Sequence, residues 1–265
     1  FVDLRPMLFK NLNLPFIIVS PEELINLYLN KIDEKTLIIA GTKSGETKEL
    51  IDALKTVRNV SEKTIIMSFI GDDNTSLDNA NILNHRISSV DTDVHLILFG
   101  WFILLYSKTN LDELKIIKNQ LNELGENIID AILENQNYCT ENIEKVDTSK
   151  MQMWVGSGNL WGEICCFCNY ILEEIQWINA QAIHSCEFFH GPFELVSNCF
   201  NVNIVLSSDE KIRKQDMRVL NFVKQHTTNY FVIDMKNFKL NNLNEQITDF
   251  VEPYILNHYF DMMLS

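Results

Sequence analysis

One short apolar run constrains the fold of this 265-residue chain more than any other stretch. Residues 36–40 read Thr-Leu-Ile-Ile-Ala, the pattern of a strand that is covered on both faces in a parallel sheet. The run ends at Gly41, and residues 48–57 then follow the period of a helix. Because parallel strands need a crossover connection, this order predicts a strand and helix of an α/β fold.

The same alternation of strands and helices continues along the chain. Further strands are predicted at residues 64–69, 82–88, 151–155, 201–208 and 230–235. A long helix is predicted at residues 160–177, and residues 147–149 are interpreted as a linker. We therefore predict an α/β protein with two halves, residues 1–147 and 148–265. Each half is expected to be a parallel sheet flanked by helices in a three-layer α/β/α arrangement.

Two local signals precede the first strand. Residues 14–19 form a short apolar run with strand character. Residues 20–23, Ser-Pro-Glu-Glu, place a serine at the N-cap, a proline at the first helical position and a glutamate at N3. This capping box predicts a helix that continues to Leu29.

Charge and hydropathy exclude some classes of function. The net charge of −14 and a pI near 4.8 argue against nucleic-acid binding, because phosphate backbones are held by clustered lysine and arginine. The apolar run 94–106 carries His95 and is shorter than the ~20 residues that a membrane span needs. With no signal peptide recognised at its start, the protein is expected to be cytoplasmic. No metal and no organic cofactor are expected.

A polar turn follows the first predicted strand. Residues 42–47 read Thr-Lys-Ser-Gly-Glu-Thr and lead directly into the predicted helix. Free backbone N–H groups and the positive end of a helix dipole make such a turn suitable for an anion. An ordinary polar loop explains these six residues about equally well. The spacing does not match a Walker P-loop. The turn at residues 156–159 occupies the corresponding place in the second half.

A carboxylate and an imidazole stand sixteen residues apart in the second half. Glu174 lies at the end of the apolar helix beside Trp177, where we expect it to be partly buried, and His190 precedes a Gly-Pro break. Such a pair suits general acid–base catalysis. Alone, each residue is more often a surface carboxylate or a histidine that caps a turn. His184 and Glu187 are alternatives for the same role.

Four motifs together resemble the sugar isomerase (SIS) family, specifically the fructosamine 6-phosphate deglycases. They are Gly-Thr-Lys-Ser-Gly-Glu-Thr-Lys-Glu at 41–49, Gly-Ser-Gly-Asn at 156–159, Glu-Glu-Ile-Gln-Trp-Ile at 173–178 and His-Ser-Cys-Glu-Phe-Phe-His-Gly-Pro at 184–192. The isomerase half of glucosamine-6-phosphate synthase is a more distant relative. The resemblance covers nearly the whole chain.

The resemblance implies a function and a set of site residues. It makes Glu174 the catalytic carboxylate and His190 the catalytic histidine, the latter supplied by a neighbouring protomer of a homodimer with shared active sites. It implies a phosphorylated sugar–amine substrate that is split into glucose 6-phosphate and a free amine. It places the substrate phosphate on Thr42, Lys43, Ser44, Gly45 and Thr47.

Three departures from the family pattern bear on this transfer. Ile171 stands where the synthase uses a lysine, which disfavours synthase-like chemistry. The first half is expected to be incomplete at its N-terminus, and the second half to lack a C-terminal tail. Two other functions are open. One is a phosphosugar isomerase that uses the same enolisation, and the other is a non-catalytic module that binds a sugar phosphate and regulates another protein.

Overall fold

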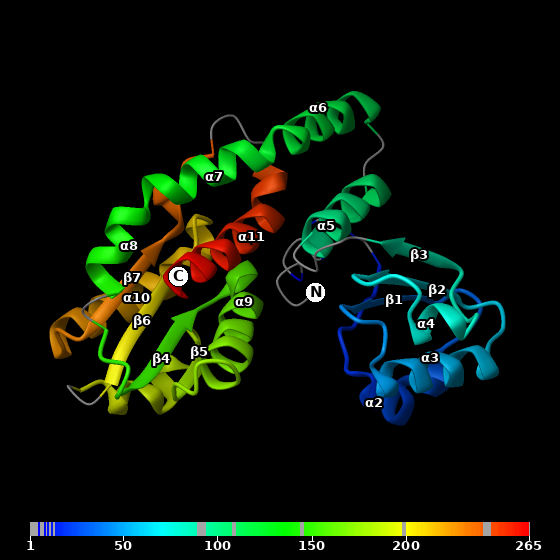
Figure 1. The fold of residues 1–265 in the computed structure, drawn as a ribbon, viewed down its shortest axis with the longest axis horizontal. Coiled ribbons are helices and arrows are strands. Elements are labelled where there is room, and N and C mark those ends of the chain that lie inside the picture. Colours follow the sequence, from blue (N-terminus) through cyan, green and yellow to red (C-terminus); the bar gives the residue numbers. More distant parts are fainter. Residues whose placement is uncertain are drawn as a thin grey trace. The chain divides into compact units, whose positions relative to one another are not determined.

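The computed structural model describes residues 14–88, 94–107, 110–143, 146–197, 200–240 and 245–264, together with Arg5, Leu8, Lys10 and Leu12. The chain forms two compact units. The first runs to Phe99, and the second begins at Gly100 and includes the four described residues near the N-terminus. Helix α5 (Val94–Ser107) contains the boundary. Both units are drawn in Figure 1.

The first unit contains a parallel sheet with the strand order β1-β2-β3. Its strands are β1 (Leu37–Thr42), β2 (Ile65–Ile70) and β3 (His85–Ser88). Its helices are α2 (Pro21–Glu23), which continues as a π-helix (Leu24–Tyr28) and a 3-10 helix (Leu29–Lys31), α3 (Lys48–Val60) and α4 (Ser76–Asn79). Leu37 pairs with Ile65, and Met67 pairs with His85.

The apolar stripe of α3 builds the core of this unit. Ile51, Leu54 and Val57 are spaced three residues apart, so they share one helix face. They pack with Ile66 and Ile70 of β2 in one buried cluster. The strand–turn–helix unit predicted from residues 36–57 is therefore confirmed.

The second unit contains a parallel sheet with the order β5-β4-β6-β7. Its strands are β4 (Met151–Gly156), β5 (Ala180–His184), β6 (Phe200–Leu206) and β7 (Tyr230–Asp234). Its helices are α6 (Leu111–Asn122), α7 (Leu124–Glu134), α8 (Gln136–Ile143), α9 (Trp161–Cys166), α10 (Glu210–His226) and α11 (Glu245–Leu264). A π-helix (Phe167–Glu173) extends α9, and 3-10 helices occupy Gly158–Leu160, Phe188–His190, Pro192–Leu195 and Met235–Asn237.

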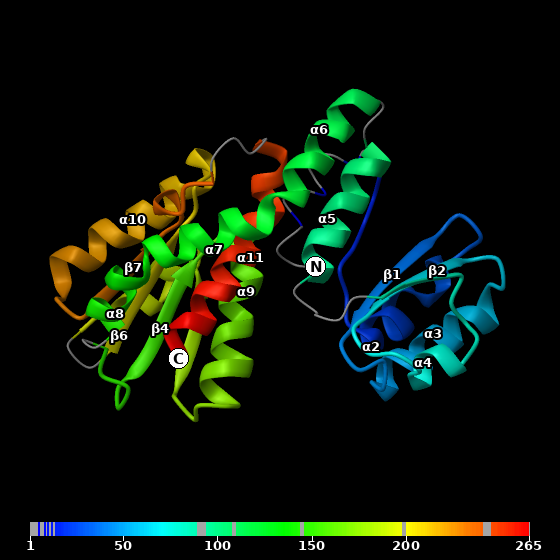
Figure 2. The same cartoon turned by 45° about the horizontal axis from the view of Figure 1, so that its top comes forward.

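Neighbouring residues of β4 show that helices cover both faces of this sheet. Val155 packs in the cluster that α10 contributes to. Trp154, which faces the other way, contacts Phe167 with ring centroids 5.0 Å apart and Phe260 of α11 at 5.4 Å. Figure 2 shows α10 and α11 on opposite sides of β4 and β6. The predicted three-layer α/β/α architecture is confirmed.

Some local predictions are confirmed and others are wrong. Ser20 forms the predicted capping box with Glu23. The strand predicted at residues 14–19 is wrong, because these residues have no ladder partner among the described strands. The helix predicted at 160–177 ends at Glu173, and β5 was not predicted. Its sequence, Ala-Gln-Ala-Ile-His, lacks the β-branched run that marks the other strands.

The helices before residue 147 pack with the second sheet's helices. Helix α11 contacts α7 and α8, so these two belong to the second compact unit. The domain boundary at 147/148 stays a prediction. Among the described helices, none is long and apolar enough to cross a membrane.

Candidate functional site

The turn after β1 has the geometry of a compact loop. The Gly45 N–H donates to Thr42 Oγ1 at 3.1 Å, which closes the loop on itself. The Gly71 N–H donates to the Thr42 carbonyl at 3.1 Å, and the Asp72 N–H to the Lys43 carbonyl at 2.9 Å. The exit turn of β2 therefore holds the first half of this loop in place.

Glycine is the residue that the centre of the loop requires. Gly45 has a φ of +64°, in the left-handed region that side chains disfavour. A Cβ atom at this position would lie 2.4 Å from Thr75 Oγ1. The Gly45 carbonyl also accepts a hydrogen bond from the Leu77 N–H at 3.0 Å. The backbone at Gly45 thus packs closely against the N-terminus of α4.

The loop ends at the start of α3, where an anion is favoured. Thr47 is the N-cap of α3, yet its side chain makes no capping hydrogen bond. Lys43 and Thr47 are exposed, and Ser44 is half-buried. An ammonium, several hydroxyls and the uncapped N–H groups of a helix are the donors that phosphate sites use.

The acidic residue of the turn is engaged with α4. The Glu46 carboxylate accepts hydrogen bonds from the Ser76 hydroxyl at 2.5 Å and the Ser76 N–H at 2.6 Å. These hydrogen bonds, that of the hydroxyl above all, lower the pKa of Glu46. The carboxylate thus links the turn to the first residue of α4.

Glu174 directly follows the π-helix and is exposed. The expectation that it is partly buried beside Trp177 is wrong for this chain, because the helix ends before it and the Trp177 side chain is 88% exposed. The Ile178 N–H donates to the Leu172 carbonyl at 2.8 Å, six residues back, one residue more than the long hydrogen bond of a Schellman motif spans. The chain turns outward there, which leaves the carboxylate in solvent.

His190 ends the 3-10 helix Phe188–His190 and is also exposed. The two preceding residues anchor it to α10. Phe188 is fully buried, and the Phe189 ring lies 5.6 Å from Phe222 and 4.0 Å below the Arg218 guanidinium. The backbone carrying His190 is therefore held by aromatic packing while its imidazole stays accessible.

The structure brings the predicted phosphate residues together in one loop, and among the residues it describes it shows no hydrogen bond between the predicted acid and base. Thr42, Lys43, Ser44, Gly45 and Thr47 form one loop in the first unit. Glu174 and His190 lie in the second unit, and no described hydrogen bond joins them. Their catalytic roles stay predictions.

The two alternative residues differ in burial. Glu187 is exposed, whereas His184 is half-buried at the end of β5. Its Nδ1 accepts the Cys186 N–H at 3.2 Å, and burial lowers the pKa of His184. A neutral imidazole that accepts at Nδ1 carries its proton on Nε2. Within the described ranges, no group of three or more histidine, cysteine, aspartate or glutamate side chains is placed to hold a metal.

The turn after β4 is closed by buried acids that sequence reasoning missed. Asp216 accepts the hydroxyls of Ser157 and Ser185, each at 2.6 Å, and the Ser207 N–H at 3.3 Å. Burial raises the pKa of Asp216. One carboxylate thus ties together the residues that follow β4, β5 and β6.

A second buried acid completes this arrangement. Glu252 accepts the Asn159 amide at 2.8 Å and the Ser208 N–H at 2.8 Å. The sequence does carry a pattern from which both buried acids could have been predicted. Apolar residues stand three, four and seven positions after each of them, which places the acids on the buried face of α10 and α11.

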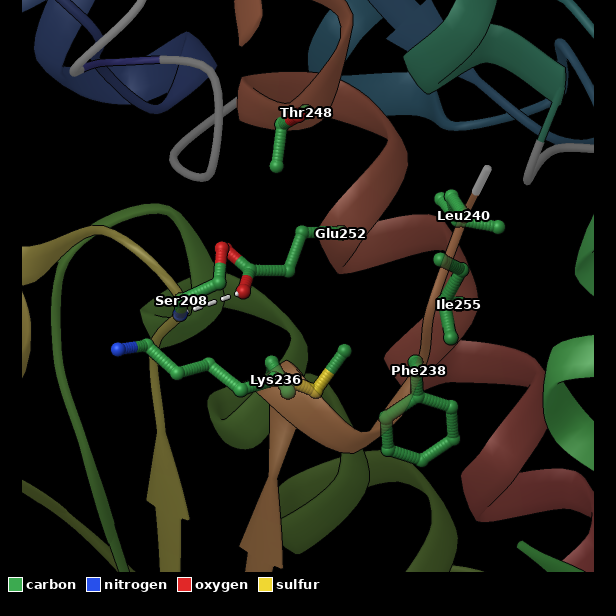
Figure 3. A pocket seen from close by; sticks show the side chains of 8 residues that line it. Ser208, Lys236, Phe238, Leu240, Thr248, Glu252 and Ile255 are labelled. Carbon is green, nitrogen blue, oxygen red and sulfur yellow. Dashed lines mark hydrogen bonds between the residues drawn. The ribbon is translucent and has the colours of Figure 1, made fainter. Parts of the chain in front are cut away.

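A small cavity lies next to Glu252 (Figure 3). Its lining combines an apolar wall with a few polar groups: Ser208, Met235, Lys236, Phe238, Leu240, Thr248, Glu252 and Ile255. Lys236 forms an ion pair with Glu210. The volume is about 160 Å³, room for about five water molecules at ~30 Å³ each. Pockets for organic ligands are usually ~300 Å³ or more, so this cavity is too small for a sugar phosphate.

Comparisons with known proteins agree with the predicted resemblance. No protein-family model matches the chain. It is 25% identical over 245 residues to fructosamine deglycase FrlB of Bacillus subtilis, a match that covers 90% of this chain and 74% of that protein. It is 27% identical over 207 residues to fructoselysine 6-phosphate deglycase of Escherichia coli. That match covers 77% of this chain and 60% of the relative, less than two thirds of its length.

Solved structures share the fold over the whole chain. A Bacillus subtilis structure with the provisional description phosphosugar isomerase superposes with a TM-score of 0.79 at 21% identity, covering 99% of this chain and 82% of that one. The C-terminal domain of glucosamine-fructose-6-phosphate aminotransferase from Francisella tularensis gives 0.76 at 16% identity, covering 99% and 80%. The resemblance to fructosamine 6-phosphate deglycases, and more distantly to the synthase, is confirmed.

Proposed function

We propose that this chain, which is similar to fructosamine deglycase FrlB over 90% of its length, cleaves a fructosamine 6-phosphate into glucose 6-phosphate and a free amine. The observation that carries the proposal is the loop between β1 and α3. It presents exposed donors at an uncapped helix N-terminus and is pinned by a glycine that has no room for a side chain. Such a loop suits the phosphate that this substrate carries.

In this proposal the loop anchors the substrate. The hydroxyls of Thr42, Ser44 and Thr47 and the ammonium of Lys43 bind the phosphate, and Gly45 allows the backbone to approach it. Because the phosphate is remote from the reacting carbon, its binding energy holds the sugar in place for the chemistry.

Glu174 and His190 then move protons. His190 assists ring opening by transferring a proton to or from the ring oxygen. Glu174 removes a proton from C1 of the open ketosamine; the C–H electrons form a C1–C2 double bond, and the C2 oxygen takes up a proton. Glu174 returns its proton to C2 while the C2 hydroxyl keeps its own, and the nitrogen lone pair forms a C1–N double bond, which leaves a protonated imine at C1. Water adds to C1, the C1–N bond breaks, and the amine leaves with a proton.

Both proposed catalytic residues are exposed in the single chain, which fits a shared site. We include in the proposal a homodimer in which Glu174 acts together with His190 of the partner subunit. Contact with a second subunit would remove these side chains from water, and a desolvated carboxylate is a stronger base.

The test is product formation from 6-phosphofructose-lysine, measured as glucose 6-phosphate. Glu174→Gln should lower turnover by about 10²-fold or more and leave substrate binding largely intact, because a general base typically contributes 10²- to 10⁴-fold. Glu126→Gln is the matched control, since this glutamate is exposed on α7 of the same unit and has no part in the proposed site. Equal turnover of Glu174→Gln and the wild type would contradict the assignment.

One second function is favoured by a specific observation. The fold is shared with proteins described as phosphosugar isomerases, and an aldose–ketose isomerase uses the same proton transfer. Product analysis separates the two, because an isomerase converts the phosphosugar without releasing an amine. Phosphate-dependent binding with no product at all would instead support a regulatory module.

A further inference from the structure

Trp177 is exposed to an extent that is unusual for an indole. Its side chain is 88% exposed, more than any other large apolar side chain in the described part of the chain. It makes no described hydrogen bond or ring contact there. Large aromatic side chains normally bury most of their area, so this exposure is unfavourable for the isolated fold.

The backbone of Trp177 is unfavourable as well. Its φ of +58° lies in the left-handed region, which glycine usually occupies just after a helix end. The Gln176 and Ile178 N–H groups donate back to Ile171 and Leu172 and hold this conformation. An indole kept at such a position, with no partner in the described chain, indicates a contact with another molecule.

The charges around Trp177 indicate what that molecule carries. Glu173 and Glu174 stand four and three residues before the indole, at the end of the preceding helix. An indole face and carboxylates both attract cations. The indole and the two neighbouring carboxylates together suit a cationic ligand.

We propose that Trp177 recognises the ammonium group on C1 of the substrate through a cation–π contact. This inference rests on the proposed function, in which Glu174 acts on C1 of a ketosamine. The nitrogen is bonded to that carbon, and Trp177 follows Glu174 by three residues. A ketose phosphate has a neutral hydroxyl at C1, so Trp177 is a specificity-determining residue that favours ketosamine over ketose phosphates.

The test compares two ligands that differ only at C1. Dissociation constants of 1-amino-1-deoxyglucitol 6-phosphate and of glucitol 6-phosphate are measured by calorimetry for the wild type, Trp177→Leu and Trp177→Phe. We expect the preference for the amino ligand to fall by about 2- to 30-fold in Trp177→Leu, with Trp177→Phe between the two. Tyr170→Leu is the control, because Tyr170 is an exposed aromatic residue of the helix that precedes Trp177.

Three results would overturn the inference. The first is an unchanged preference in Trp177→Leu, and the second is an equal loss of affinity for both ligands. The third is a change of sedimentation state in Trp177→Leu, which would assign the indole to a subunit contact. Trp177→Gly should keep or raise Tm, because glycine suits the left-handed position; a lower Tm would show that the indole packs in the fold.

These binding measurements do not depend on turnover. If the wild type forms glucose 6-phosphate and the preference is unaffected by Trp177, only the inference about Trp177 fails. If the wild type forms no glucose 6-phosphate from 6-phosphofructose-lysine, the proposed function fails, whatever the binding ratio shows.

Discussion

Two turns occupy the same topological place in the two units and use their polar residues in opposite ways. The turn after β1 leaves Lys43 and Thr47 exposed and the N-terminus of α3 without a side-chain cap. The turn after β4 directs Ser157 to Asp216 and Asn159 to Glu252, all four of them buried. Both turns follow the carboxyl end of a parallel strand, where α/β proteins usually bind ligands.

The difference shows that position in the topology does not by itself make a ligand site. In the second turn the donors are already satisfied by carboxylates, and two buried acids oppose an incoming phosphate. In the first turn the acidic Glu46 is bound to Ser76 of α4 instead. The buried acids thus give the second turn a structural role, and anion binding is proposed for the first turn alone.

The largest expected effect on stability comes from removing the carboxylate that holds the second turn. Asp216→Ala removes the acceptor of two buried hydroxyls and one N–H, so we expect the free energy of unfolding to fall by about 2–4 kcal/mol. Urea denaturation measures it. Lys214→Ala, an exposed change on the same helix, should stay within ~0.5 kcal/mol. A loss of less than ~1 kcal/mol in Asp216→Ala would mean that this carboxylate does not hold the turn.

The next effect comes from distorting the first turn. Gly45→Ala places a methyl group 2.4 Å from Thr75 Oγ1 at a φ of +64°, so we expect a loss of about 1–3 kcal/mol in stability. Affinity for inorganic phosphate should fall with it, because the loop changes shape. Gly125→Ala is the control: this glycine lies in α7 with nothing near its Cβ position, and alanine there should be neutral or stabilising. Unchanged phosphate affinity in Gly45→Ala would separate this loop from anion binding.

The smallest effect is a pH dependence of the stability of the second turn. Burial raises the pKa of Asp216 above its ordinary value of 3.8, so the folded state binds the proton more tightly than the unfolded state. Protonated Asp216 therefore contributes fully to the free energy of unfolding below the ordinary pKa. This contribution is lost as the pH rises through the raised pKa of the folded state. The wild type should therefore gain stability relative to Asp216→Asn as the pH falls from neutrality towards 3.8. Parallel stability curves for the two proteins, measured by urea denaturation, would contradict this assignment.

Local patterns predicted much of the fold and of the first turn. The strand at 36–40 and the helix start at Ser20 could be predicted from a few adjacent residues. Neighbouring side chains and backbone groups determine the structure of both segments. Strand β5 was missed because its short, mixed sequence acquires strand structure by pairing with β4. The exposure of Glu174 was missed because the helix ended four residues earlier than predicted.

The sequence by itself determined the alternation of strands and helices, the polar turn at 42–47 and the resemblance carried by Glu174 and His190. These are properties of adjacent residues and of helix and strand periods. Only the tertiary structure decided that Gly45 packs against Thr75 and that the second turn is closed by two acids. Those contacts join residues 30 to 93 positions apart, and a partner at that distance is chosen by how helices and strands pack rather than by any local pattern.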